Sequence, residues 1–130
     1  MKSIVNWHLP IKTASESNCS EHWSIKANRH RLQKLGIFKE FLVNPPKFSF
    51  PCHVTLTRIA PRKLDEGDNL PCSLKYIRDA IAEKLTGISQ AGRADGDSRI
   101  KWDYKQERGS PTEYAVKIEF ISEGDHDLHK

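Results

Sequence analysis

Two short acidic segments carry the residues of this chain that are best suited to chemistry. The first, 64–68, reads Leu-Asp-Glu-Gly-Asp and places three carboxylates within four residues. The second, 95–97, reads Asp-Gly-Asp. Carboxylate oxygens are the ligands that a hard cation such as Mg²⁺ prefers. If the two segments meet in space, they can hold one divalent cation, which activates water and neutralises charge on a phosphoryl group.

The candidate residues divide into ligands and a cation. Asp65, Asp68 and Asp97 are the candidate metal ligands, with Mg²⁺ as the expected ion and Mn²⁺ as a possible substitute. Lys75 is the candidate cation, because a nearby ammonium stabilises charge that develops on a phosphate. The candidate catalytic set is therefore Lys75, Asp68 and Asp97. The acids held in reserve are Glu66, Asp79 and Asp95.

Simpler explanations exist for each of these residues. Asp68 can be a helix cap and nothing more, because a helix follows it and Pro71 suits the first turn of that helix. Asp65 can be an ordinary loop acid, and Asp97 can simply begin a turn. Lys75 and Asp79 stand four residues apart, so they can form a surface ion pair that contributes well under about 1 kcal/mol.

Basic residues surround both acidic segments. The chain has 130 residues and a net charge of +4, which permits a polyanionic partner without proving one. We predict DNA contacts from basic residues that fall in three clusters, one early and one beside each acidic segment. These residues are Arg29, Arg31, Lys34, Arg62, Lys63, Arg93 and Arg99. Positive charge around a small acidic focus is what a metal-dependent enzyme acting on phosphodiesters requires.

Several classes of protein are disfavoured by the sequence. No apolar run approaches the ~20 residues of a membrane helix, and the N-terminus does not resemble a signal peptide, so we expect a cytoplasmic protein. Three scattered cysteines indicate neither a disulfide framework nor a zinc site. The glycine-rich stretch 86–97 lacks the Gly-Lys-Ser/Thr ending of a phosphate-binding loop.

The order of predicted elements is strand, helix, strand, helix, strand, strand. Alternating apolar residues predict strands over 3–11 and 48–59 and around 100–104 and 114–120, the last two as an antiparallel hairpin. Helices are predicted over 20–43, after a capping box at 18–21, and over 69–85. In the first helix five residues fall close to one apolar face: Trp23, Ala27, Leu35, Phe38 and Leu42, with Ile25, Leu32 and Phe41 flanking it. In the second, an apolar stripe predicts a core face, formed by Leu70, Leu74, Ile77, Ile81 and Leu85.

This order predicts an α+β fold with a small mixed four-stranded sheet and two main helices packed on one face. Residues 1–121 form a single domain and 122–130 a polar tail. Each acidic segment borders one end of the second helix, so their convergence depends on how the later strands pack.

The combined motif resembles the RusA-type Holliday-junction resolvases of bacteria and prophages. The resemblance lies in Leu64-Asp65-Glu66-Gly67-Asp68-Asn69-Leu70, in Lys75 with Asp79 on a helix, and in 95–100 before a strand. It covers about 54–120 best. The family pattern is Asp-x-Asp-Asn-Leu, and this chain has one further residue in that loop and three more before the lysine.

The resemblance implies an Mg²⁺-dependent endodeoxyribonuclease that acts as a homodimer and cuts four-way DNA junctions symmetrically during recombination and repair. It places the metal ligands on Asp65, Asp68 and Asp97 and the essential lysine on Lys75, with Glu66 as the alternative to Asp65. Two other functions stay open. One is a non-catalytic DNA-binding module on the same scaffold, and the other is a protein-interaction domain that uses apolar helix faces.

Overall fold

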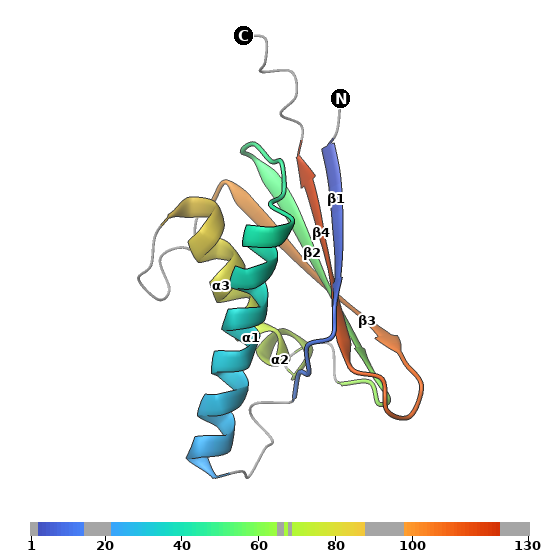
Figure 1. Ribbon diagram of the computed structural model, residues 1–130. Helices are drawn as coiled ribbons and strands as arrows, with labels where there is room; N and C mark the ends of the chain where they lie inside the picture. The colour runs from blue at the N-terminus through green and yellow to red at the C-terminus, as the bar shows by residue number, and fades with distance from the viewer. Residues whose placement is uncertain (1–2, 15–21, 65–66, 68, 88–97, 123–130) are drawn as a thin grey trace, which may run out of the picture.

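A computed structural model of the chain describes residues 3–14, 22–64, 67, 69–87 and 98–122. Figure 1 shows one mixed sheet with the helices gathered on one of its faces. The strands are β1 (Ser3–Leu9), β2 (Cys52–Ala60), β3 (Ile100–Arg108) and β4 (Ala115–Ser122). The helices are α1 (Trp23–Val43), α2 (Asn69–Ser73) and α3 (Lys75–Thr86). The predicted α+β class, with a four-stranded mixed sheet and two main helices on one face, is confirmed.

The strand order is β1-β4-β2-β3. β4 pairs antiparallel with both β1 and β2, whereas β2 and β3 run parallel. The predicted β3–β4 hairpin is therefore wrong. β3 alternates charged residues along its length and takes an edge, where charge discourages further strand pairing. β4 is largely buried and takes an inner position, where both of its edges are paired.

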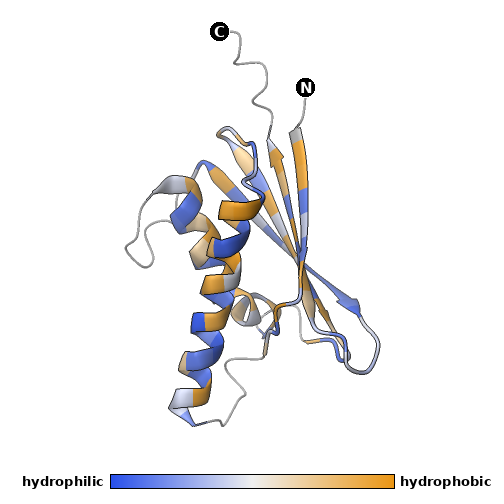
Figure 2. Cartoon of the chain, viewed as in Figure 1, coloured by the Kyte–Doolittle hydropathy of each residue, from blue (hydrophilic) through white to orange (hydrophobic). Residues whose placement is uncertain are grey.

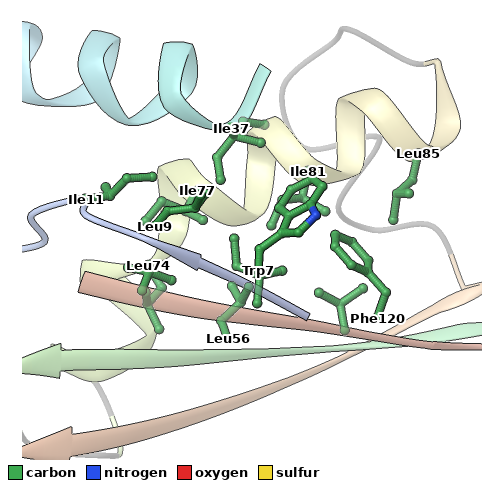
Figure 3. Close-up of a cluster of buried hydrophobic side chains, with 14 of the residues drawn as sticks. Trp7, Leu9, Ile11, Ile37, Leu56, Leu74, Ile77, Ile81, Leu85 and Phe120 are labelled. Atoms are coloured by element: carbon green, nitrogen blue, oxygen red, sulfur yellow. The ribbon is translucent and has the colours of Figure 1, made fainter. Parts of the chain in front are cut away.

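The core lies between the sheet and the helices (Figure 3). The alternation predicted in the first strand is confirmed, because Trp7 and Leu9 are buried and Trp7 makes edge contacts with the rings of Phe41 and Phe120, each at 4.9 Å between centroids. The apolar stripe predicted for the second helical segment is also confirmed. Its five residues are all buried: Leu70, Leu74, Ile77, Ile81 and Leu85.

The second helical segment is interrupted where the sequence predicted one helix over 69–85. Leu74 has φ −105° and ψ 1°, so it separates α2 from α3. The Leu74 amide donates to the Pro71 carbonyl, and the Ser73 hydroxyl donates to the Leu70 carbonyl, both three residues back. These tight bonds end α2, so α3 begins at Lys75. α3 ends at Gly87, whose φ of 76° suits glycine.

α1 differs from its prediction at its start and in its buried face. His22 caps it by accepting a hydrogen bond from the Ser24 amide at 3.2 Å. The capping box predicted at 18–21 lies outside the described residues. Most of the predicted apolar face does not face the core, because Trp23, Leu35 and Leu42 are exposed, whereas Phe38 packs against the core. The buried residues of α1 are Gln33 and Ile37.

The sequence also predicted that the domain ends at residue 121 and that the chain has no membrane-spanning helix. β4 continues through Ser122, one residue beyond the predicted domain end, and the rest of the predicted tail lies outside the described residues. In the part of the chain that the structure describes, no helix has the length and apolar character needed to cross a membrane.

Candidate functional site

The three predicted metal ligands, Asp65, Asp68 and Asp97, lie outside the described residues, as do Glu66, Asp95 and Arg93. Among the residues that are described, no group of three His, Cys, Asp or Glu side chains could hold a metal ion. What the structure defines is how each acidic segment joins the fold and what surrounds Lys75.

The first acidic segment is held where it leaves the sheet. The Leu64 amide donates to Gln106 Oε1 at 2.8 Å, and Gln106 Nε2 donates to the Leu64 carbonyl at 2.7 Å. Arg58 Nη1 also donates to the Arg62 carbonyl at 2.7 Å. Both partners lie near the carboxyl ends of neighbouring strands, since Arg58 and Gln106 are paired in the β2–β3 register. The segment that carries Asp65 and Asp68 therefore starts at that end of the sheet.

The second acidic segment joins the fold at the other end of β3. The Cys52 amide donates to the Arg99 carbonyl at 2.9 Å, immediately before β3 begins. Ile100 and Gln106 are six residues apart in one strand, which corresponds to about 20 Å. Asp97 is two residues from Arg99, a distance of at most about 7 Å. The described attachments of the two acidic segments are thus separated along β3.

Lys75 and Asp79 are brought together as the spacing predicted. Lys75 Nζ lies 3.4 Å from Asp79 Oδ2, and the two side chains are 58% and 28% exposed. α3 starts at Lys75, and neither an acidic residue in its first turn nor a side-chain cap offsets the positive end of the helix. A half-exposed ammonium at this end favours an anion such as a phosphate group.

Arg78 and an aromatic pair were not singled out from the sequence. The Arg78 guanidinium lies 5.0 Å from the centre of the Trp102 ring and donates a hydrogen bond to the Tyr104 hydroxyl. Arg78 is three residues from Lys75 and next to Asp79, so its helical spacing was the available signal. Trp102 and Tyr104 fall between Ile100 and Gln106, so the Arg78 side chain reaches the part of β3 between the two attachments.

The predicted DNA-binding residues that are described fall in separate places. Lys34 on α1 lies 3.7 Å from Glu83 on α3, whereas Arg31, one turn earlier on α1, donates to Asn28 at 2.6 Å. Arg62 and Lys63 are exposed directly after β2. The remaining two are Arg29, which is half-buried on α1, and Arg99, which lies 4.0 Å from the Phe50 ring.

Arg58, a basic residue near the end of β2, has a structural role. It is 6% exposed, and its Nε donates to Thr13 Oγ1 at 2.9 Å. Burial lowers the pKa of the Arg58 guanidinium from its ordinary value. Arg58 therefore ties β2 to the segment after β1 and is not positioned to contact DNA.

His30 and Tyr76 border Lys75. Their rings stack at 3.6 Å between centroids, and Lys75 Nζ lies 5.3 Å from the centre of the Tyr76 ring. Arg78 is one turn further along α3, and its own ring contacts are with Trp102 and Tyr104. Cations and aromatic rings are the side chains that bind the backbone and bases of nucleic acids, and the rings here are half-buried.

Comparison with known proteins adds no relative. No protein-family model matches the chain, and no curated protein matches it. The likeness to RusA-type resolvases therefore rests on the motif quoted above.

Proposed function

We propose that the protein is an Mg²⁺-dependent endodeoxyribonuclease that cuts four-way DNA junctions in recombination and repair. The observation that supports this best is the Lys75–Asp79 pair, 3.4 Å apart at the start of α3 and directly after the first acidic segment. A resolvase of this kind cuts two symmetric strands, so we propose a homodimer, and we expect it in the cytoplasm.

We assign metal-binding, charge-stabilising and DNA-binding roles to different residues of the chain. Asp65, Asp68 and Asp97 would hold the ion, and their oxygens are a donor set that suits Mg²⁺ or Mn²⁺. The bound ion would supply charge neutralisation at the scissile phosphate. Lys75 stabilises negative charge on the phosphoryl oxygens, and Asp79 orients the ammonium. Arg78 and the basic residues of α1 hold the DNA backbone in place.

Asp79 has a second possible role in this proposal. The acidic segments attach at opposite ends of β3, and Asp79 is next to Arg78, which contacts Trp102 between those ends. Asp79 also pairs with Lys75, so its carboxylate is a candidate to join the ligands from the acidic segments. On this proposal Asp79→Asn reduces cleavage more than loss of a surface ion pair alone would.

Cleavage of a synthetic four-way junction in Mg²⁺ tests the proposal. We expect the parent protein to nick the junction symmetrically. Asp68→Asn should abolish cleavage and keep junction binding, because it removes a ligand charge and little else. Lys75→Ala should lower the rate by roughly 10²-fold, the scale for loss of one charge-stabilising group. Asp103→Asn is the matched control, since Asp103 is an exposed carboxylate of β3 that pairs with His53 at 2.6 Å.

A non-catalytic DNA-binding module is the alternative, and the separated attachments of the acidic segments favour it. Catalysis fails when a ligand is displaced by about 1 Å, whereas binding through cations does not depend on that geometry. Junction binding without product in either Mg²⁺ or Mn²⁺ would support the module and contradict the nuclease. Normal cleavage by Asp68→Asn would show that the assigned site is wrong.

A further inference from the structure

α1 has a second apolar stripe on the side that faces away from the sheet and from α3. We call it the outer stripe. It consists of exposed residues, namely Ile25 at 53%, Leu32 at 54%, Leu35 at 51% and Leu42 at 81%. Figure 2 shows apolar segments alternating with polar ones along the whole of α1. Single exposed apolar residues are ordinary, but several of them aligned on one side of a helix mark a binding surface.

The described contacts of α1 leave the outer stripe uncovered. On one flank, His30 stacks on Tyr76 and Lys34 pairs with Glu83, so α3 occupies that side. On the other flank, Gly36 lies against Ile11 and Gln33 donates to the Lys12 carbonyl at 2.9 Å. The outer stripe runs between these two flanks, opposite the buried Ile37.

The spacing within the outer stripe is that of a helix–helix seam. Its four residues follow one another at intervals of seven, three and seven, which are the first and fourth positions of a heptad repeat. The same repeat places Asn28 and Lys39 in the two remaining seam positions. From Ile25 to Leu42 the seam is about 26 Å long.

The seam is complementary to a second, antiparallel copy of itself. A two-fold axis between residues 33 and 34 sets Leu32 against Leu35 of the partner subunit and Ile25 against Leu42 of the partner subunit. The same axis sets Asn28 against Lys39 of the partner subunit. Every apolar position then meets an apolar one and every polar position a polar one, twice over, as two-fold symmetry requires.

Other arrangements of the same two helices are worse. A parallel pair places Lys39 against Lys39 of the partner subunit, and like charges at a seam repel. Sliding the antiparallel pair by one seam step places Lys39 against Leu35, or Asn28 against Leu32, of the partner subunit. Polar residues at seam positions fix register in this way in coiled coils.

We propose that the outer stripe is the surface through which two copies of this chain associate, with the two α1 helices antiparallel and centred between residues 33 and 34. The proposal rests on the faces of α1 and not on nuclease activity. It gives the homodimer a specific surface and register.

Light scattering on the full chain tests the surface. The parent should have the mass of a dimer, and Leu32→Glu should raise the dimer Kd by roughly 100-fold or more, since each substitution acts twice at the centre of the interface. Leu32 is exposed in the subunit, so the variant should keep its circular dichroism spectrum. Ile4→Glu is the matched control, because Ile4 is equally exposed at 55% on β1, and it should stay dimeric.

Oxidative cross-linking tests the register, in a background that carries Cys19→Ser and Cys72→Ser. The double variant Ile25→Cys/Leu42→Cys should form covalent dimers. Each single variant should not, because two copies of one position stand about 26 Å apart in the antiparallel pair. A monomeric parent, a Leu32→Glu protein that remains dimeric, or dimers cross-linked by Ile25→Cys alone would overturn the proposal. None of these measurements needs DNA or metal, so they stand apart from any failure of cleavage.

Discussion

α1 and α3 pack on the same face of the sheet and use their apolar residues in different ways. α3 turns Ile77, Ile81 and Leu85 into the core and leaves Lys75 and Lys84 outside. α1 buries Ile37 and leaves the outer stripe exposed. A helix whose apolar residues occupy one side has only one way to face the core. A helix with two apolar sides can bury only one of them in the core, and the other side is available for binding another molecule.

The two helices also differ in what their inner faces contain. The buried residues of α3 are all apolar. The inner face of α1 includes Gln33, which is 1% exposed and donates to the Lys12 carbonyl. Buried polar groups need a partner, and this one connects α1 to the segment that follows β1. The position of α1 is therefore set by a polar bond as well as by apolar packing.

The largest expected difference in the free energy of unfolding is between substitution of a buried residue of α3 and substitution of an exposed residue of α1. Ile77→Ala should lower the free energy of unfolding by about 2–5 kcal/mol, because Ile77 is fully buried and its removal leaves a cavity. Leu42→Ala should change it by less than about 0.5 kcal/mol in the monomer. Urea denaturation at the lowest workable protein concentration measures both, and equal losses would contradict the assigned faces.

Gln33→Ala should have an intermediate effect. Loss of the bond to the Lys12 carbonyl and of a fully buried side chain should lower the free energy of unfolding by about 1–3 kcal/mol. Arg31→Ala, an exposed change on the same helix, serves as control and should be near neutral. If Gln33→Ala were also neutral, the bond to the Lys12 carbonyl would not contribute to holding α1.

The smallest expected difference in stability is between substitutions at Gly87, which follows α3, and at Gly36, which lies inside α1. Gly87→Ala at the end of α3 should cost about 1 kcal/mol, because φ is 76° there. Gly36→Ala inside α1 should lie within about 0.5 kcal/mol of neutral, since a gain in helix propensity is offset by crowding of Ile11, whose Cδ1 would lie 3.2 Å from the new methyl group. Thermal unfolding of both variants measures the contrast. A stable Gly87→Ala would mean that the end of α3 rearranges.

Local patterns predicted much of this fold. The alternation in β1, the apolar stripe of α2 and α3, and the proximity of Lys75 to Asp79 all follow from spacing within one element. The insertion of β4 between β1 and β2 depends on pairing between distant segments, which periodicity does not encode. The burial of Arg58 has the same origin, because its partner Thr13 is 45 residues away in the chain. The α1 faces could not be assigned because apolar residues lie on both sides.

The candidate site follows the same division. The Lys75–Asp79 pair was available from the sequence, and Arg78 could have been added from its helical spacing. Its aromatic partners, Trp102 and Tyr104, come from β3, so their approach depends on the parallel pairing of β3 with β2. The attachment of the acidic segments at opposite ends of β3 is likewise a property of the sheet and not of either segment.

The Gln106 side chain determines how Leu64 is held at the end of the sheet. Its amide has the same donor and acceptor as a peptide group, and it meets both the amide and the carbonyl of Leu64. These two hydrogen bonds therefore extend the pairing of β2 with β3 by one step, but they come from a side chain with rotatable bonds. A change of Gln106 rotamer would break both of these bonds to Leu64 without breaking any backbone hydrogen bond between β2 and β3.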